Sequence, residues 1–136
     1  MKKLINCLFL TSMSILLSSC DPGFNVILQN DSGHPIDVKV VSEDSYIKHY
    51  DSIDIATTIT SDFTKQGVIA ITKFPDSTYT FKLKESHTAE VDYGIGGPDK
   101  KLKIIINSKD TLTFDSSEYH KEGGFMNKSH IFRIKK

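Results

Sequence analysis

The stretch TYTFKLK, residues 78–84, decides the fold class because polar and apolar side chains alternate along it. Tyr79, Phe81 and Leu83 are apolar, and polar residues such as Lys82 separate them. A period of two is typical of a β-strand that has one face in the core and the other in water. We therefore expect a half-buried strand in which Phe81 points inward and Lys82 points outward.

Similar short runs flank this stretch in both directions, and clusters of turn-forming residues separate them. Two such clusters are NDSGHP, residues 30–35, and GIGGPD, residues 94–99. No window sustains the 3.6-residue apolar period of a helix, and the best helical candidate is a short turn at Ser116–His120. The expected strands are Phe24–Gln29, Ile36–Val41, Tyr46–Tyr50, Ser52–Thr57, Gly67–Thr72, Thr78–Lys84, His87–Tyr93, Lys101–Asn107, Thr111–Phe114 and Ser129–Lys135.

Many short strands with frequent turns are typical of two packed sheets or of a closed barrel. We expect a single all-β domain, an immunoglobulin-like Greek-key β-sandwich, with a small β-barrel as the alternative. The chain has no tryptophan, so the cysteine–tryptophan core of antibody domains is missing and only the wider architecture is predicted. The run Ile104–Ile106 is expected to be buried on both faces of its sheet.

The beginning of the chain differs in composition from the rest. Lys2 and Lys3 give a positive start, residues 4–17 are mostly apolar, and the small residues of Leu17-Ser18-Ser19-Cys20 follow. These are the parts of a secretory signal, in the order in which such signals carry them. The apolar part is too short for a membrane-spanning helix, which needs about 20 apolar residues.

The segment Leu17-Ser18-Ser19-Cys20 resembles the lipobox of bacterial lipoproteins. The resemblance implies that residues 1–19 are removed as a lipoprotein signal peptide and that Cys20 is lipidated, with acyl chains such as palmitate. Residues 20–23 would then be a short lipidated tether and residues 24–136 the β-sandwich domain. The expected partner is a membrane, contacted through the lipid anchor, with the domain close to its surface. An ordinary cleaved signal that leaves a free cysteine is the alternative.

The remainder of the chain is similar to small lipoproteins of Bacteroidota. The segments that carry this likeness are NDSGHPI at residues 30–36, KIII at residues 103–106 and NKSHIF at residues 127–132. The resemblance implies a protein of the cell envelope, lipid-anchored and expected in the outer membrane, from a family without an assigned activity.

Charge and cysteine content argue against several classes of function. Removal of Lys2 and Lys3 with the signal would leave 15 of the 17 basic residues against 17 acidic ones. No basic excess for nucleic-acid binding remains. Of the two cysteines, Cys7 lies in the signal and Cys20 would carry lipid, so we expect no disulfide, thiolate metal site or cysteine nucleophile.

No catalytic or metal-binding motif is visible in the sequence. The Gly-x-Ser-x-Gly elbow of serine hydrolases and the His-Glu-x-x-His motif of zinc proteases are both missing, and the five histidines are dispersed. The glycines at residues 94–97 lack the Gly-Lys-Ser/Thr ending of a phosphate-binding loop. We therefore expect no enzyme activity, no cofactor and no metal.

Two tripeptides resemble the Asp-Ser/Thr-apolar sites that Bacteroidota O-glycosylate in exported proteins. They are Asp51-Ser52-Ile53 and Asp110-Thr111-Leu112. The resemblance implies that Ser52 and Thr111 carry sugar.

Two classes of function remain open. The first is a non-enzymatic domain that binds an envelope protein or has a structural part, and an unpaired sheet edge or an exposed apolar patch would favour it. The second is a module that binds a small ligand or glycan for a surface uptake system, which a concave pocket with convergent polar groups would favour. The loop at Gly123-Gly124, close to Tyr119 and Phe125, either exposes its aromatic rings for recognition or packs Phe125 into the core.

Overall fold

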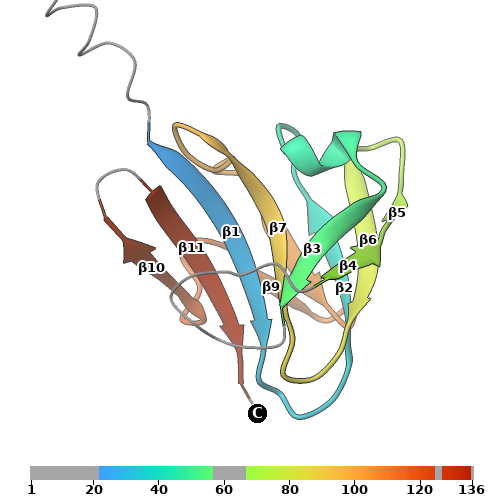
Figure 1. The fold of residues 1–136 in the computed structure, drawn as a ribbon. Coiled ribbons are helices and arrows are strands. Elements are labelled where there is room, and N and C mark those ends of the chain that lie inside the picture. The colour runs from blue at the N-terminus through green and yellow to red at the C-terminus, as the bar shows by residue number, and fades with distance from the viewer. Residues whose placement is uncertain (1–21, 57–66, 125–126, 136) are drawn as a thin grey trace, which may run out of the picture.

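The computed structural model describes residues 22–56, 67–124 and 127–135, which form two β-sheets packed face to face (Figure 1). The elements are β1 (Gly23–Asn30), β2 (Ile36–Val41), the 3₁₀ helix η1 (Tyr46–His49), β3 (Ser52–Ala56), β4 (Gly67–Ala70), β5 (Thr72–Lys73), β6 (Thr78–Leu83), β7 (Thr88–Ile95), β8 (Lys103–Ile106), β9 (Asp110–Leu112), β10 (Tyr119–Gly123) and β11 (Asn127–Ile134).

The two sheets confirm the predicted all-β sandwich. In the described ranges the first sheet has the strand order β10-β11-β1-β7-β3-β4, and the second has the order β5-β6-β2-β8-β9. Both sheets are open, so the barrel alternative is not realised. The Greek-key connectivity stays a prediction.

β1 and β11 lie side by side and run in the same direction. Their parallel ladder extends from Gly23↔Asn127 to Asn30↔Ile134, whereas the other ladders described are antiparallel. Both strands therefore begin at one end of the sandwich and finish at the other (Figure 1).

The strand directions give the sandwich two distinct ends, to which we refer below. The N-terminal end consists of Gly23, the segment 42–51, the turn 74–77 and the loop 96–102. The opposite end consists of the turns 31–35, 84–87 and 107–109.

β6 is the half-buried strand that the sequence predicted, and it lies between β5 and β2. Tyr79, Phe81 and Leu83 are buried, and Lys82 is exposed. The Tyr79 hydroxyl donates a hydrogen bond to the Val91 carbonyl, which satisfies the polar end of a fully buried ring. The apolar residues of the neighbouring strand β2 follow the same period of two, and they pair with those of β6 in the register Ile36↔Leu83, Val38↔Phe81 and Val40↔Tyr79.

The predicted strand Tyr46–Tyr50 is wrong, because this segment forms η1. Ser45 causes the difference. Its hydroxyl oxygen accepts a hydrogen bond from the Ile47 backbone N–H (3.1 Å), as an N-cap does, and donates one to the carboxylate of Asp92 (2.8 Å). Because Asp92 is buried in β7, a long-range polar contact fixes the local structure here.

The segment before β10 was also predicted incorrectly. Instead of a helical turn at Ser116–His120, residues 114–118 form turns, and β10 begins at Tyr119. The turns are closed by bonds from the Ser116 N–H to the Thr113 carbonyl (3.0 Å) and from the Tyr119 N–H to the Ser116 carbonyl (3.1 Å).

The buried run on β8 departs from its prediction too. Ile104 and Ile106 are buried, but Ile105 faces outward and is only half-buried. Burial on both faces is therefore wrong for Ile105.

One side of the sandwich is bridged by a strand that changes sheets. The run predicted as a single strand, Gly67–Thr72, divides into β4 of the first sheet and β5 of the second. The crossing residue Ile71 donates its backbone N–H to the Asp51 carbonyl (3.1 Å), and Lys73 pairs with the Asp51 carboxylate (2.7 Å). On the other side, β9 and β10 belong to different sheets, and a cleft lies between them.

Candidate functional site

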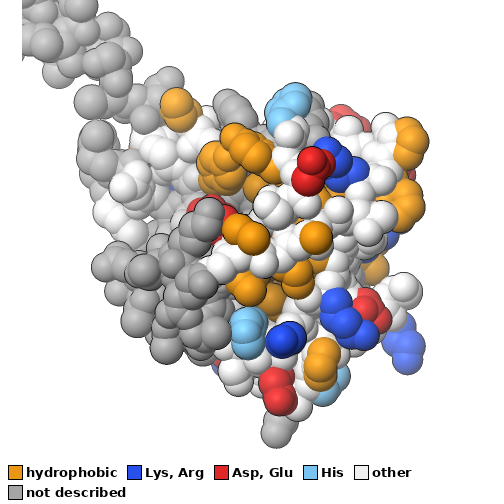
Figure 2. Space-filling model, turned by 45° about the vertical axis from the view of Figure 1, so that its right-hand side comes forward, with side chains coloured by type: hydrophobic (Ala, Val, Ile, Leu, Met, Phe, Trp, Pro, Cys, Tyr) orange, Lys and Arg blue, Asp and Glu red, His pale blue; other side chains and the backbone are white. Residues whose placement is uncertain are grey.

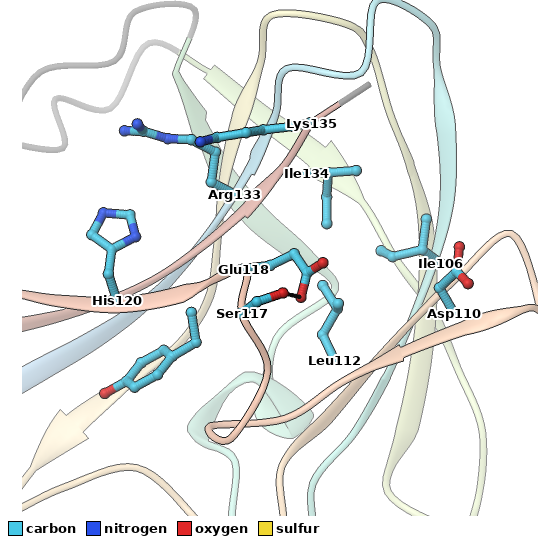
Figure 3. Close-up of a pocket in the computed structure, with 10 residues that line it drawn as sticks. Ile106, Asp110, Leu112, Ser117, Glu118, His120, Arg133, Ile134 and Lys135 are labelled. Carbon is cyan, nitrogen blue, oxygen red and sulfur yellow. Dashed lines mark hydrogen bonds between the residues drawn. The ribbon is translucent and has the colours of Figure 1, made fainter.

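The candidate site is this cleft, which has a volume of about 470 Å³ and lies toward the opposite end of the sandwich. Its interior is formed by apolar side chains from three strands, Ile106, Leu112 and Ile134. Figure 3 shows these three in the middle of the cleft, between Glu118 and Asp110. The cleft thus has an apolar floor and a charged mouth.

The charged groups at the mouth carry both signs. Asp110 and Glu118 are acidic, whereas His120, Arg133 and Lys135 are basic or can become so. Arg133 and Lys135 extend in the same direction in Figure 3, because residues two apart on a strand share a face. Ile134 lies between them in the chain and faces the interior, so Arg133 and Lys135 extend away from the apolar side chains, at the outer edge of the cleft.

Arg133 is only loosely held within the protein. Its Nε lies 3.8 Å from the Asp31 carboxylate, which is an ion pair but too long for a hydrogen bond. This Nε is buried and has no hydrogen-bond partner in the described part of the chain. This Nε–H is therefore an unsatisfied donor inside the protein, and its burial keeps it from a ligand at the mouth.

The position of Glu118 follows from the turn before β10. The Ser116 hydroxyl accepts a hydrogen bond from the Thr113 N–H (2.8 Å), and the Arg133 N–H donates to the Glu118 carbonyl (2.9 Å). The second bond continues the β10–β11 ladder by one residue, so the Glu118 backbone is fixed beside β11. Ser117 then donates from its hydroxyl to the Glu118 carboxylate (3.1 Å; Figure 3).

An aromatic cluster supports the wall of the cleft. Phe114 packs edge-on against Tyr119, with ring centroids 5.2 Å apart, and its ring is tilted against that of Phe132 at 5.5 Å. The Tyr119 hydroxyl lies 2.9 Å from Nδ1 of His130. Burial lowers the pKa of His130, and the nearby Lys121 and Lys128 lower it further. His130 is therefore neutral at pH 7, and its hydrogen bond with the Tyr119 hydroxyl supports the wall from behind.

The predicted modification sites do not meet in the cleft. Thr111 is exposed on the edge strand β9, and Ser52 is half-buried at the start of β3 in the other sheet. Their glycosylation stays a prediction. Cys20 and Phe125 lie outside the described residues.

Two negative findings concern the described ranges alone. Over residues 22–56, 67–124 and 127–135, no three histidine, cysteine or acidic residues are grouped as metal ligands. Within those ranges no helix is long and apolar enough to cross a membrane.

The sequence did not predict the cleft, because its lining comes from four strands and two sheets. Only the alternation in Ser129–Lys135, with Ile134 between Arg133 and Lys135, signalled one of its walls. Comparison with protein-family models, curated proteins and solved structures found no match to this chain.

Proposed function

We propose that this chain is a lipoprotein of the bacterial cell envelope, held in the outer membrane by lipid on Cys20, with a non-enzymatic binding domain. The lipobox-like Leu17-Ser18-Ser19-Cys20 supports the anchor. The cleft between β9 and β10 supports binding, because it is an open recess in which a few apolar side chains lie beside several polar and charged ones.

The ligand that best fits the cleft is an extended segment of another envelope protein. β9 and β10 are edge strands, each with a neighbour on one side only in the described part of the chain. An edge strand offers backbone groups to a segment that adds to the sheet, and pockets beside it select the side chains. Here Ile106, Leu112 and Ile134 would receive an apolar side chain of that segment.

Site-specific photo-cross-linking in cells tests this proposal. A photoreactive residue at Asp110 or Lys135, both exposed at the mouth, should give one cross-linked envelope protein. The same residue at Lys82, exposed on the outer face of the second sheet, should not give that product. Equal products from all three positions would contradict a site in the cleft.

Two half-buried isoleucines test the cleft, and because Ile134 also packs against the core, a dichroism spectrum of each variant must first show that the domain still folds. Ile134 lines the cleft and Ile105 faces outward on β8, and both are half-buried. Ile134→Asp should abolish the cross-link from Asp110, because a carboxylate in the apolar floor is costly to bury. Ile105→Asp should leave it unchanged.

The anchor has its own test. Cys20→Ala should leave the protein unlipidated and release it from membranes, whereas the native protein should require detergent, since more than one acyl chain holds firmly. A mass spectrum of the mature protein with an unmodified Cys20 would contradict the proposed anchor.

A small ligand or glycan is the second candidate. The cleft volume of about 470 Å³ falls within the range of small-ligand sites, and polar groups converge at its mouth. Native mass spectrometry of the protein released from its own membranes would then find a bound small molecule, absent from Ile134→Asp. Finding no such molecule, together with a cross-linked protein, would decide for the first candidate.

A further inference from the structure

Large hydrophobic side chains are exposed mainly at the N-terminal end. Tyr50 is 49% exposed, Phe74 47% and Ile95 66%. The fourth exposed large hydrophobic residue of the described ranges, Val68, lies on the edge strand β4. We refer to Tyr50, Phe74 and Ile95 as the apolar tips.

Strand register places the apolar tips at one end. Ile95 is the direct partner of Gly23, where β1 begins. Phe74 donates its N–H to the Thr78 carbonyl (2.8 Å), at the end of β6 that pairs with Val41. Tyr50 follows η1, in the segment that leaves β2 at that same end (Figure 1). Figure 2 shows hydrophobic side chains at the surface along this upper part of the molecule.

The tips are held by the fold. The Tyr50 ring packs against Tyr93 at a centroid distance of 6.2 Å, and its N–H donates to the Ile47 carbonyl (2.9 Å). The residue after Ile95, Gly96, donates its N–H to the Pro22 carbonyl (2.9 Å). Ordered apolar groups can be transferred to another phase with little loss of conformational entropy.

The proposed lipid anchor would bring a bilayer within reach of the apolar tips. Gly23 is the third residue after Cys20, and a fully extended chain spans at most about 3.6 Å per residue, or roughly 11 Å in total. If Cys20 carries lipid, as proposed above, the N-terminal end must lie against the bilayer surface.

We infer that the apolar tips Tyr50, Phe74 and Ile95 enter the headgroup–acyl boundary of the membrane that anchors Cys20, so that the domain stands on this end. Tyrosine and bulky aliphatic or aromatic residues suit that boundary.

Two lysines beside the tips are paired with carboxylates. Lys73 lies 2.7 Å from the Asp51 carboxylate, and Lys101 lies 3.1 Å from that of Glu43. The segments of this end carry no excess of lysine over acidic residues. Attraction to anionic headgroups is therefore not part of the inference, and phosphatidylcholine is a suitable probe.

Depth-dependent quenching tests the inference on the full lipidated protein in phosphatidylcholine vesicles. After processing and lipidation, an introduced cysteine would be the sole thiol available for a dye. Gly97 is a suitable reporter in the loop after Ile95, because a Cβ added there meets nothing within 4 Å. The control position is Lys109, exposed in a turn of the opposite end.

We expect spin-labelled lipid to quench the dye on Gly97→Cys several-fold more strongly than the dye on Lys109→Cys. Combining Gly97→Cys with Tyr50→Ser, Phe74→Ser and Ile95→Ser should remove this difference, while the dichroism spectrum stays unchanged because the tips are exposed. Equal quenching at both positions, or no effect of the serine variant, would overturn the inference.

Failure of the anchor is distinguishable in the same sample. Mass spectrometry reports the state of Cys20, and an unmodified Cys20 would overturn both the anchor and the inference. A lipidated Cys20 with an unquenched Gly97 reporter would overturn the inference alone. Protection of that reporter from both lipid and aqueous quenchers would indicate a protein on this end, and would overturn it too.

Discussion

The two ends of the sandwich differ in how their turns are held and in what they expose. At the opposite end, the buried Asn30 side chain donates to the carbonyls of His34 (2.8 Å) and Lys84 (3.1 Å) and accepts from the Ser32 hydroxyl (2.6 Å). The polar groups of these turns form hydrogen bonds within the protein. The N-terminal end also has an internal polar contact, Ser45 with Asp92, but it presents apolar tips outward.

The comparison separates side chains that folding requires from side chains that it does not. Asn30 must be bonded because a buried amide without partners is costly. The exposed parts of Tyr50, Phe74 and Ile95 stabilise nothing inside the protein, and the membrane contact inferred above would bury them.

The largest expected effect is at the opposite end. Asn30→Ala removes several buried hydrogen bonds, and should lower the free energy of unfolding by about 2–4 kcal/mol. Denaturant unfolding of the Cys20→Ala form measures this. Lys109→Ala, in an exposed turn of the same end, is the control and should change stability by under about 0.5 kcal/mol. Similar losses for both variants would mean that the Asn30 network does not hold this end.

Ser45→Ala tests the internal contact of the N-terminal end. The variant loses the cap of η1 and one hydrogen bond to a buried carboxylate, so we expect a loss of about 1–3 kcal/mol. Ser45→Thr keeps the hydroxyl and should recover part of it. A loss greater than that of Asn30→Ala in the same denaturant series would reverse the ranking of the two ends.

The third expected effect is a pH dependence at His130, whose ring contacts the hydroxyl of the cleft residue Tyr119. Its folded-state pKa is lowered, chiefly by burial, so the folded protein binds this proton less readily than the unfolded chain. Above the unfolded-state pKa of about 6.5, the histidine is neutral in both states and does not change the free energy of unfolding. As pH falls from there through the folded-state pKa, the unfolded chain takes up the proton first, so the free energy of unfolding decreases. His130→Phe should flatten the unfolding free energy between about pH 7 and pH 5. An equally steep curve in the variant would show that another group carries the dependence.

The smallest expected effect on stability is at the apolar tips. Phe74→Ser and Ile95→Ser should each change the free energy of unfolding in solution by under about 0.5 kcal/mol, because the side chains are half or more exposed. The contrast with Asn30→Ala sharpens the comparison, since these residues matter for membrane contact and not for folding. A loss above about 1 kcal/mol would mean that the tips are structural.

The sequence predicted those parts of the fold that depend on local alternation. β2 and β6 carry strict alternation, and their inward and outward faces were correct because burial imposes the period of two directly. β10 was missed because YHKEG is polar throughout, as suits a short edge strand exposed to water.

The remaining errors arose from contacts between residues far apart in the sequence. η1 depends on the bond between Ser45 and Asp92, 47 residues away. The sheet change at Ile71 depends on Asp51. The cleft depends on the topology that places β9 beside β10. No local pattern carries this information, so apart from the wall formed by β11 the candidate site followed from the three-dimensional arrangement.

The parallel ladder between β1 and β11 determines how the domain would carry tension. A lipid anchor would pull at Gly23, while a partner in the cleft would pull near Ile134, at the far end of the ladder. Two parallel strands pulled from opposite ends slide along each other, so the force loads all their evenly spaced hydrogen bonds together in shear. An antiparallel hairpin pulled at its open end would instead unzip one bond at a time. This placement of anchor and cleft therefore directs mechanical load along the direction in which the sheet resists it best.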